Sequence, residues 1–315
     1  MILKSTFWLE SVDDVEIYVE KWHDPGKKPR AIVQIAHGMV EHFQRYHGFA
    51  DFLVTHDIFV YGNDHRGHGK TGQKQGLMGY LSEQNGFEKT RDDLFSITKI
   101  ISEEYPDVPI FLLGHSMGSF LARNYIQEYS DVIQGVILSG TGFYPKLTTT
   151  LGKLLASKLN PKEKSPLMNK LAFGAFNRKV QDPKTPFDWI SRDDQIVKDY
   201  MQDRYSGYIP TASFFFDLMT GISYIHNPKL NARIRKDLPI LFISGEEDPV
   251  GNYGKGIWKT ASLYERQGIQ NIITVLFEGA RHEVLNETNK SEVYDGMLQW
   301  ILRNLPKMEG ETLPN

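Results

Sequence analysis

Short apolar runs alternate with helical patterns along this chain, and the alternation constrains the fold more strongly than any other feature of the sequence. Continuous apolar strands separated by helices predict a parallel sheet that is covered by helices on both faces. Residues 5–11 and 15–22 have the pattern of a hairpin that precedes this sheet. We expect buried strands at AIVQIAHG (31–38), IFVYGNDH (58–65), PIFLLGHS (109–116), GVILSGTG (135–142), PILFISGEED (239–248) and IITVLFEGARH (272–282), and helices at 46–56, 87–105, 116–129, 254–267 and 290–304.

One long segment interrupts the alternation. Residues 143–235 separate two expected strands and are several times longer than a usual connection. We interpret 143–235 as an inserted helical cap, and 1–142 together with 236–315 as an α/β core. The predicted cap holds 15 Lys and Arg against 8 Asp and Glu, a net charge of +7, whereas the rest of the chain carries −10. We expect the apolar side chains of the cap to be mostly buried: Leu147, Leu151, Leu154, Leu155, Leu167, Leu171, Phe173, Phe176, Phe214, Phe215, Phe216, Leu218 and Met219.

The composition is that of an ordinary globular protein, because 40% of the 315 residues are hydrophobic and 24% are charged. The absence of cysteine excludes disulfides, thiolate metal sites and a cysteine nucleophile. No uncharged apolar run reaches membrane-spanning length, and the N-terminus lacks the apolar region of a signal peptide, so we expect a soluble, cytoplasmic protein. A net charge of −3 argues against a general nucleic-acid-binding protein.

The motif G-x-S-x-G lies at the junction between an expected strand and an expected helix, in LLGHSMGSFLARNYI. A strand that turns directly into a helix leaves its corner residue exposed and strained, and Gly114 and Gly118 would let the two elements pass closely. Ser116 occupies the corner, at a helix N-terminus whose amides favour a developing anion. The motif also arises by chance, so partners for this serine are needed.

A carboxylate and a histidine follow at the ends of the last two strands. Asp248 stands before a Pro-Val-Gly turn and is our choice of acid, while Glu246 and Glu247 remain alternatives. His282 lies in the loop after the last strand. A serine hydroxyl needs an imidazole to take its proton, and a carboxylate must hold that imidazole in the correct tautomer. The order Ser116, Asp248, His282 is that of the α/β-hydrolase triad.

The loop after the first buried strand, HGMVEHFQRY, is placed to supply a second hydrogen-bond donor for an oxyanion. The backbone N–H of Met39 would join that of Met117 at the same position. Glu41 and Arg45 stand four residues apart and are expected to pair; an ion pair that holds the loop is favoured over a substrate contact.

Two histidines in NDHRGHGKT invite a metal interpretation. No carboxylate-rich cluster accompanies His65 and His68, so we expect no metal site, and the nearby glycines indicate a loop. Asp64 and Arg66 are expected to tie this loop to the backbone.

Five motifs, in this order, resemble the monoacylglycerol lipase and lysophospholipase branch of the α/β-hydrolases, also called the serine aminopeptidase-like hydrolases. They are HGMVEHFQRY, DHRGHGKT, GHSMGS, SGEEDPVGNYGKG and GARHEVLNE, and DWISRDDQIVKDYMQDRYSGY in the predicted cap is similar to bacterial members. The resemblance implies the α/β-hydrolase fold, with a mostly parallel eight-stranded sheet, helices on both faces and an inserted helical cap. It implies Ser116, Asp248 and His282 as the triad, with Met39 and Met117 as oxyanion donors.

Two details of the resemblance concern single residues. Glu41 and Arg45 match a charged pair that relatives carry in the same loop, and substrate binding by these two residues is the alternative to the ion pair. Ser119 departs from the second glycine that many relatives have after the elbow. We expect this change to alter helix packing slightly and to leave the chemistry intact.

The activity that the resemblance implies is hydrolysis of a carboxylic ester through an acyl-enzyme, without a cofactor. We expect a single-chain lipid ester as substrate, monoacylglycerol or lysophospholipid, because a helical insertion over the strand ends is where an acyl tunnel would form. A small-molecule carboxylesterase, a serine aminopeptidase and a non-catalytic binding protein of the same fold are alternatives. The basic cap predicts transient contact with an anionic membrane surface, unless its charge is only a solvated face. The oligomeric state does not follow from the sequence.

Overall fold

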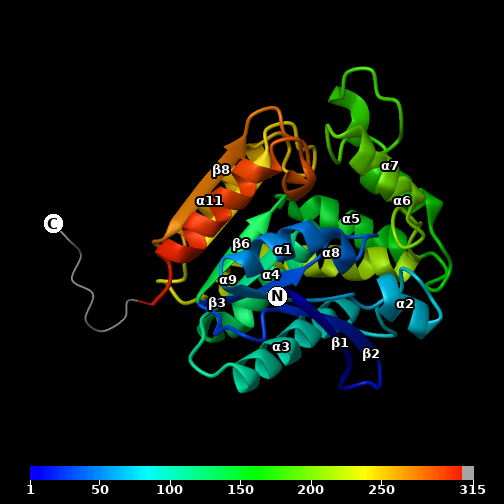
Figure 1. The fold of residues 1–315 in the computed structure, drawn as a ribbon. Coiled ribbons are helices and arrows are strands. Elements are labelled where there is room, and N and C mark those ends of the chain that lie inside the picture. Colours follow the sequence, from blue (N-terminus) through cyan, green and yellow to red (C-terminus); the bar gives the residue numbers. More distant parts are fainter. Residues whose placement is uncertain (307–315) are drawn as a thin grey trace.

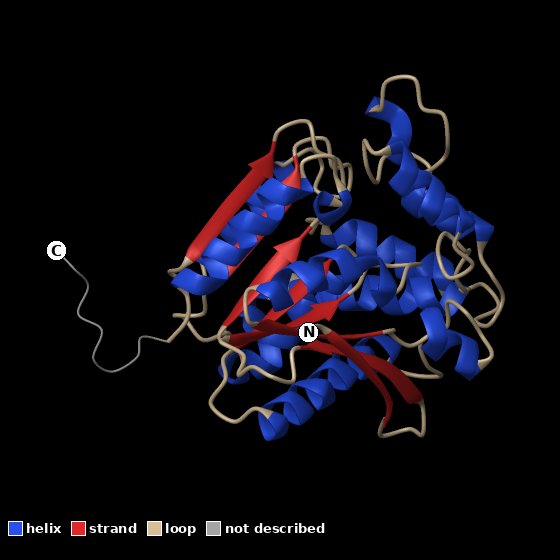
Figure 2. Ribbon diagram, viewed as in Figure 1, coloured by secondary structure: helices blue, strands red, loops and turns tan. Residues whose placement is uncertain are grey.

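Eight strands form one sheet in the computed structural model, which describes residues 1–306 (Figures 1 and 2). Their order across the sheet is β1-β2-β4-β3-β5-β6-β7-β8. The pairs β1–β2 and β2–β4 are antiparallel, and all the other neighbours are parallel, so the predicted mostly parallel eight-stranded sheet is confirmed. The strands are β1 (Leu3–Glu10), β2 (Glu16–His23), β3 (Ala31–Ala36), β4 (Ile58–Asn63), β5 (Ile110–His115), β6 (Gly135–Ser139), β7 (Ile240–Gly245) and β8 (Ile272–Phe277).

Helices cover both faces of the sheet, because successive side chains of each central strand point to opposite sides. On β3, Ile32 belongs to the apolar layer that α3, α4 and α10 share, whereas Val33 belongs to the layer under α1 and α11. The five helices expected from the sequence are therefore present, as α1 (His47–Thr55), α3 (Gly86–Glu104), α4 (Met117–Tyr129), α10 (Lys255–Glu265) and α11 (Lys290–Arg303).

Two local expectations were wrong. The last strand was expected to be buried on both faces, but Ile273 and Val275 in β8 are 44% and 36% exposed, since β8 is the edge strand and pairs only with β7. The segment around Gly67 and Gly69 was expected to be only a loop, yet the short helix α2 (Gly69–Gln75) begins there. Both glycines adopt positive φ angles, which make the turn that precedes this helix.

Residues 143–235 contain five α-helices, and part of this segment extends beyond the sheet around α6 and α7 (Figure 1). In contrast, α8 packs on α3 and α4. The division of the chain into a core and a cap at residues 142 and 236 stays a prediction. The helices are α5 (Lys146–Ala156), α6 (Pro166–Phe173), α7 (Asp194–Gln202), α8 (Ala212–Ile225) and α9 (Pro228–Asn231).

The expectation that the apolar side chains of this segment are mostly buried was wrong for six of them. Leu147, Leu151 and Leu154 follow one face of α5 and are 69%, 55% and 57% exposed. Leu167 and Leu171 do the same on α6. The sixth is Phe216, which is 36% exposed, whereas Phe214, Phe215 and Leu218 on the same helix α8 are buried. Among the helices of residues 1–306, none has both the length and the apolar composition that crossing a membrane requires.

Candidate active site

Ser116 stands between β5 and α4, with a φ angle of 51° and a ψ angle of −119°. This conformation costs a non-glycine residue free energy and is typical of residues held in place for function. Two glycines make the corner sterically feasible. A Cβ on Gly118 would lie 2.0 Å from the carbonyl oxygen of Ala36, and a Cβ on Gly114 would lie 2.3 Å from the carbonyl oxygen of Gly118. The predicted strand-to-helix corner is therefore present, and Ser116 is partly exposed at its apex.

Asp248 and His282 form a hydrogen bond, with Oδ1 of the aspartate 2.9 Å from Nδ1 of the histidine. Both side chains are buried. Asp248 also accepts hydrogen bonds from the hydroxyl of Ser244 at 2.9 Å and from the amide of Val250 at 2.8 Å. Burial by itself would raise the pKa of Asp248, but the charge and hydrogen bond of His282 outweigh it and lower that pKa. Burial lowers the pKa of His282, and the carboxylate of Asp248 more than offsets it, so that this pKa is raised.

The two alternative acids lie elsewhere. Glu246 and Glu247 both have exposed side chains, and their backbone amides bond to the carbonyls of Phe277 and Ala280. Among the described residues, Asp248 is the carboxylate that pairs with the imidazole of His282.

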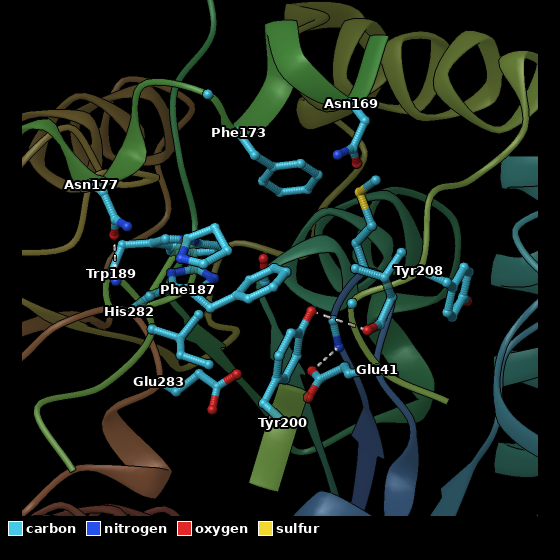
Figure 3. Close-up of a pocket in the computed structure, with 18 of the residues that line it drawn as sticks. Glu41, Asn169, Phe173, Asn177, Phe187, Trp189, Tyr200, Tyr208, His282 and Glu283 are labelled. Carbon is cyan, nitrogen blue, oxygen red and sulfur yellow. Dashed lines mark hydrogen bonds between the residues drawn. The ribbon is translucent and has the colours of Figure 1, made fainter. Parts of the chain in front are cut away.

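Ser116 and His282 line one cavity of about 280 Å³, which also reaches Met39. Figure 3 shows His282 and other residues that line this cavity. Small residues allow the close approach: a Cβ on Gly38 would lie 3.2 Å from the Cβ of Ser116, and one on Gly140 would lie 2.9 Å from the ring of His282. Within residues 1–306, no hydrogen bond joins Ser116 Oγ to His282. Such bonds often form only when substrate is bound, so the shared cavity is the relevant geometry.

The two predicted oxyanion donors lie on different elements: Met39 lines the cavity, and Met117 directly follows Ser116. Met39 lies in the loop after β3, and Met117 is the first residue of α4. In the part of the chain that the structure describes, neither backbone N–H donates to a protein acceptor. A hydrogen bond within the loop after β3 stabilises it: the amide of Gly38 donates to the carboxylate of Glu41 at 2.5 Å. Two free amides at the N-terminus of a helix and in an adjacent loop can stabilise a negative oxygen between them.

Glu41 and Arg45 form the predicted pair, and a third residue joins them. Arg45 Nη1 donates to Glu41 at 2.7 Å, and its two terminal nitrogens each donate to the carboxylate of Glu283 at 2.6 Å. Burial would raise the pKa of Glu41, but the guanidinium charge prevails and lowers it. Glu41 also accepts from the hydroxyl of Tyr46. Glu41 lines the cavity, whereas Arg45 is occupied by the two carboxylates. The sequence contained no signal for Glu283 beyond its place next to His282.

Residues 143–235 contribute most of the residues that line the cavity, and five of these are aromatic. Figure 3 shows Trp189 beside His282 and Tyr200 beside Glu41. Residues 143–235 are rich in Phe and Tyr, but no local sequence pattern indicates which of these rings point inward. The aromatic and amide residues of this wall are Phe173, Phe187, Trp189, Tyr200, Tyr208, Asn169 and Asn177.

The histidine-rich loop after β4 is a packed structural cluster. His37 Nε2 accepts a hydrogen bond from the amide of His65, and burial lowers the pKa of His65 to about 3 and that of His68 to about 4. The described residues include no group of three or more potential metal ligands.

The expected anchoring of this loop was confirmed for Asp64, which accepts from the backbone amides of Phe43 and Lys70. It was wrong for Arg66, whose guanidinium pairs with the side chains of Asp93 and Asp13, because these carboxylates are brought beside it by the N-terminal hairpin and α3.

Several known proteins that resemble this chain over most of its length are lipases and esterases. A family model described as serine aminopeptidase, S33, matches residues 27–289. The chain is 28% identical over 299 residues to the monoacylglycerol lipase of Mycolicibacterium smegmatis, covering 93% of this chain and 95% of that one. It is 27% identical over 313 residues to the monoglyceride lipase of Rattus norvegicus, covering 97% and 93%. Among solved structures, a highly thermostable carboxyl esterase from Bacillus coagulans in complex with glycerol matches with a TM-score of 0.88 and 29% identity, covering 96% and 99%.

Proposed function

The chain belongs to the serine aminopeptidase S33 family and is a serine ester hydrolase, and from this premise we propose that its substrates are carboxylic esters of single-chain lipids, monoacylglycerols or lysophospholipids. One observation carries the proposal: the cavity that reaches Ser116 is walled by aromatic side chains and has a volume of about 280 Å³. A space of this size lies just below the usual range for small-molecule pockets and suits one acyl chain better than a bulkier ligand.

In the proposed mechanism His282 takes the proton of Ser116 Oγ, and this oxygen attacks the ester carbonyl. Asp248 keeps the proton of the imidazole on Nδ1 and stabilises the imidazolium that forms. The amides of Met39 and Met117 hold the negative oxygen of the tetrahedral intermediate. The imidazolium then protonates the leaving alcohol, and water repeats the cycle on the acyl-enzyme.

The alternative activities differ in what they require of the cavity. An aminopeptidase needs free carboxylates or carbonyls to bind an ammonium group, but Glu41 and Glu283 are both engaged by Arg45. A short-chain carboxylesterase would need no long apolar wall. A non-catalytic binding protein has no use for the strained serine corner and the Asp248–His282 pair. The lipid esterase accounts for all of these features.

The predicted cap supports a second part of the proposal, which is transient contact with an anionic lipid surface. Leu147, Leu151 and Leu154 form an exposed apolar face on α5, and Leu167 and Leu171 are exposed on α6. Exposed apolar side chains on a helix with basic neighbours are typical of segments that bind at membrane interfaces. The lysines at 146, 158 and 170 are exposed close to these leucines in the sequence.

A substrate panel tests the proposed activity. We expect p-nitrophenyl esters of medium and long acyl chains to be hydrolysed with a higher kcat/KM than the acetate, and aminoacyl p-nitroanilides to be left intact. Ser116→Ala should lose at least about 10⁴-fold in rate while its circular dichroism spectrum is unchanged, because one hydroxyl at a partly exposed corner contributes little to packing. A clear preference for the acetate would identify a short-chain esterase, and inactivity on every ester would contradict the proposal.

A further inference from the structure

The loop that carries His282 is bonded along its backbone to a short stretch from the predicted cap, residues 188–192. The amide of His282 donates to the carbonyl of Trp189 at 3.3 Å, and the amide of Glu283 donates to the carbonyl of Ile190 at 2.8 Å. These bonds join two segments that are more than ninety residues apart in the sequence. The main chain at His282 is therefore held by the 188–192 segment.

Two side chains strengthen this connection. Arg281 Nη1 donates to the carbonyls of Asp188 at 2.6 Å and Ser191 at 2.9 Å. The buried carboxylate of Glu287 accepts from the amide of Arg281 at 2.9 Å, and from both the amide and Nε of Arg192 at 3.0 and 2.9 Å. Glu287 thus binds the histidine loop and the 188–192 segment at once, with charge-assisted hydrogen bonds.

The imidazole itself is enclosed between rings. The ring of Trp189 lies 5.0 Å from that of His282, between centroids, and His115 lies 4.7 Å from it. Trp189 is buried, and its backbone amide donates to the side chain of Asn177 (Figure 3). This hydrogen bond stabilises the position of the 188–192 segment. These two rings cover part of the imidazole and limit its rotation.

We infer that the 188–192 segment positions His282 for ester hydrolysis, with Arg281 and Arg192 as positioning residues. The inference rests on the proposed function, in which His282 is the base. Its consequence is that the chemical step depends on the predicted cap even for a small soluble ester that makes no use of the apolar wall. Misplacing a reacting group by about 1 Å can cost about 100-fold in rate.

The test compares Arg281→Met with Arg178→Met, which removes an exposed arginine of residues 143–235 that lies outside the 188–192 segment. We expect Arg281→Met to lower kcat on p-nitrophenyl acetate by about 10- to 100-fold with KM within about twofold. The acid limb of its pH profile should also move to higher pH, because the variant would hydrate His282 and so remove the burial that lowers its pKa. Arg178→Met should match the wild type.

A second variant separates positioning from misfolding. Arg192→Met deletes only the contacts of a partly exposed side chain. We expect it to lower kcat less than Arg281→Met does and to leave KM within about twofold. Its thermal transition should stay close to that of the wild type. Arg281→Lys should restore part of the lost kcat. Reaction with a fluorophosphonate probe tests the proposed function separately, since an unreactive, inactive wild type would overturn that function. An active wild type with unchanged kcat and pH profile in both methionine variants would overturn the inference.

Discussion

Burying an unpaired carboxylate destabilises a folded protein, and Asp248 is completely buried. The residue is stable in this position because His282, Ser244 and the amide of Val250 all bond to it. The neighbouring Glu247 is exposed and makes none of these contacts. At the scale of single residues, the choice among adjacent acids is therefore decided by which side chain can be desolvated at an acceptable free-energy cost.

We predict that Asp248→Asn lowers kcat for a p-nitrophenyl ester by roughly 10⁴-fold, because the amide would hold the imidazole in the wrong tautomer. Glu247→Gln is the matched control and should stay within about twofold of the wild type, since its side chain is in solvent. Steady-state kinetics and a thermal melt of each variant provide the measurement. A larger loss for Glu247→Gln would move the acid to that position.

At the scale of elements, α8 meets the N-terminus of α3 through a buried carboxylate. A Cβ on Gly86, the first residue of α3, would lie 2.2 Å from Oδ2 of Asp217, and one on Gly221 would clash with the ring of Phe87. The two helices are thus in close contact at these glycines. Burial, together with the charge of Glu88, raises the pKa of Asp217 to about 7, although the amide of Gly86 acts in the opposite direction.

This carboxyl group predicts a pH-dependent stability. A carboxyl whose folded pKa lies above its unfolded value favours the folded state when protonated, so stability should fall as the pH rises from about 4 to 7. We expect Asp217→Asn to raise the melting temperature at pH 8 and to change it less at pH 5. The exposed Asp295→Asn is the control and should show no such difference. Equal shifts at both pH values for Asp217→Asn would show that this charge does not affect stability.

At the scale of the whole molecule, charge and apolar surface are distributed unevenly. Residues 143–235 carry a net charge of +7 against −10 for the rest of the chain, and the same residues expose the leucines of α5 and α6. Long-range attraction to an anionic surface and insertion of leucines into it would act on the same part of the protein. The remaining acidic surface would keep the rest of the molecule away from the lipid.

We predict that monoacylglycerol presented in anionic vesicles is hydrolysed about threefold faster or more than in neutral vesicles, and that added salt reduces this gain. Leu151→Ser should remove much of the gain and leave the hydrolysis of p-nitrophenyl acetate unchanged, because Leu151 is 55% exposed. Val132→Ser, at an exposed valine outside 143–235, is the control. Equal rates on both vesicle types at low salt would mean that the positive charge is only a solvated face.

The sequence by itself determined the features that depend on neighbouring residues. Apolar periodicity located all eight strands and the five helices that cover the sheet, and the glycines around Ser116 predicted a corner that only such small residues permit. The chain order of Ser116, Asp248 and His282 follows from the strand ends at which they stand. These signals are local because backbone conformation and strand burial are set within a few residues.

Only the tertiary structure decided which distant side chains meet. Nothing near Glu283 in the sequence indicates Arg45, and nothing near His282 indicates Trp189, because each contact depends on how 143–235 and the core loops pack. The same packing decided that Leu151 faces solvent while Phe215 is buried, although both belong to apolar helix patterns. Helical periodicity specifies that a face is apolar, whereas its partner is chosen by the summed contacts of the folded chain.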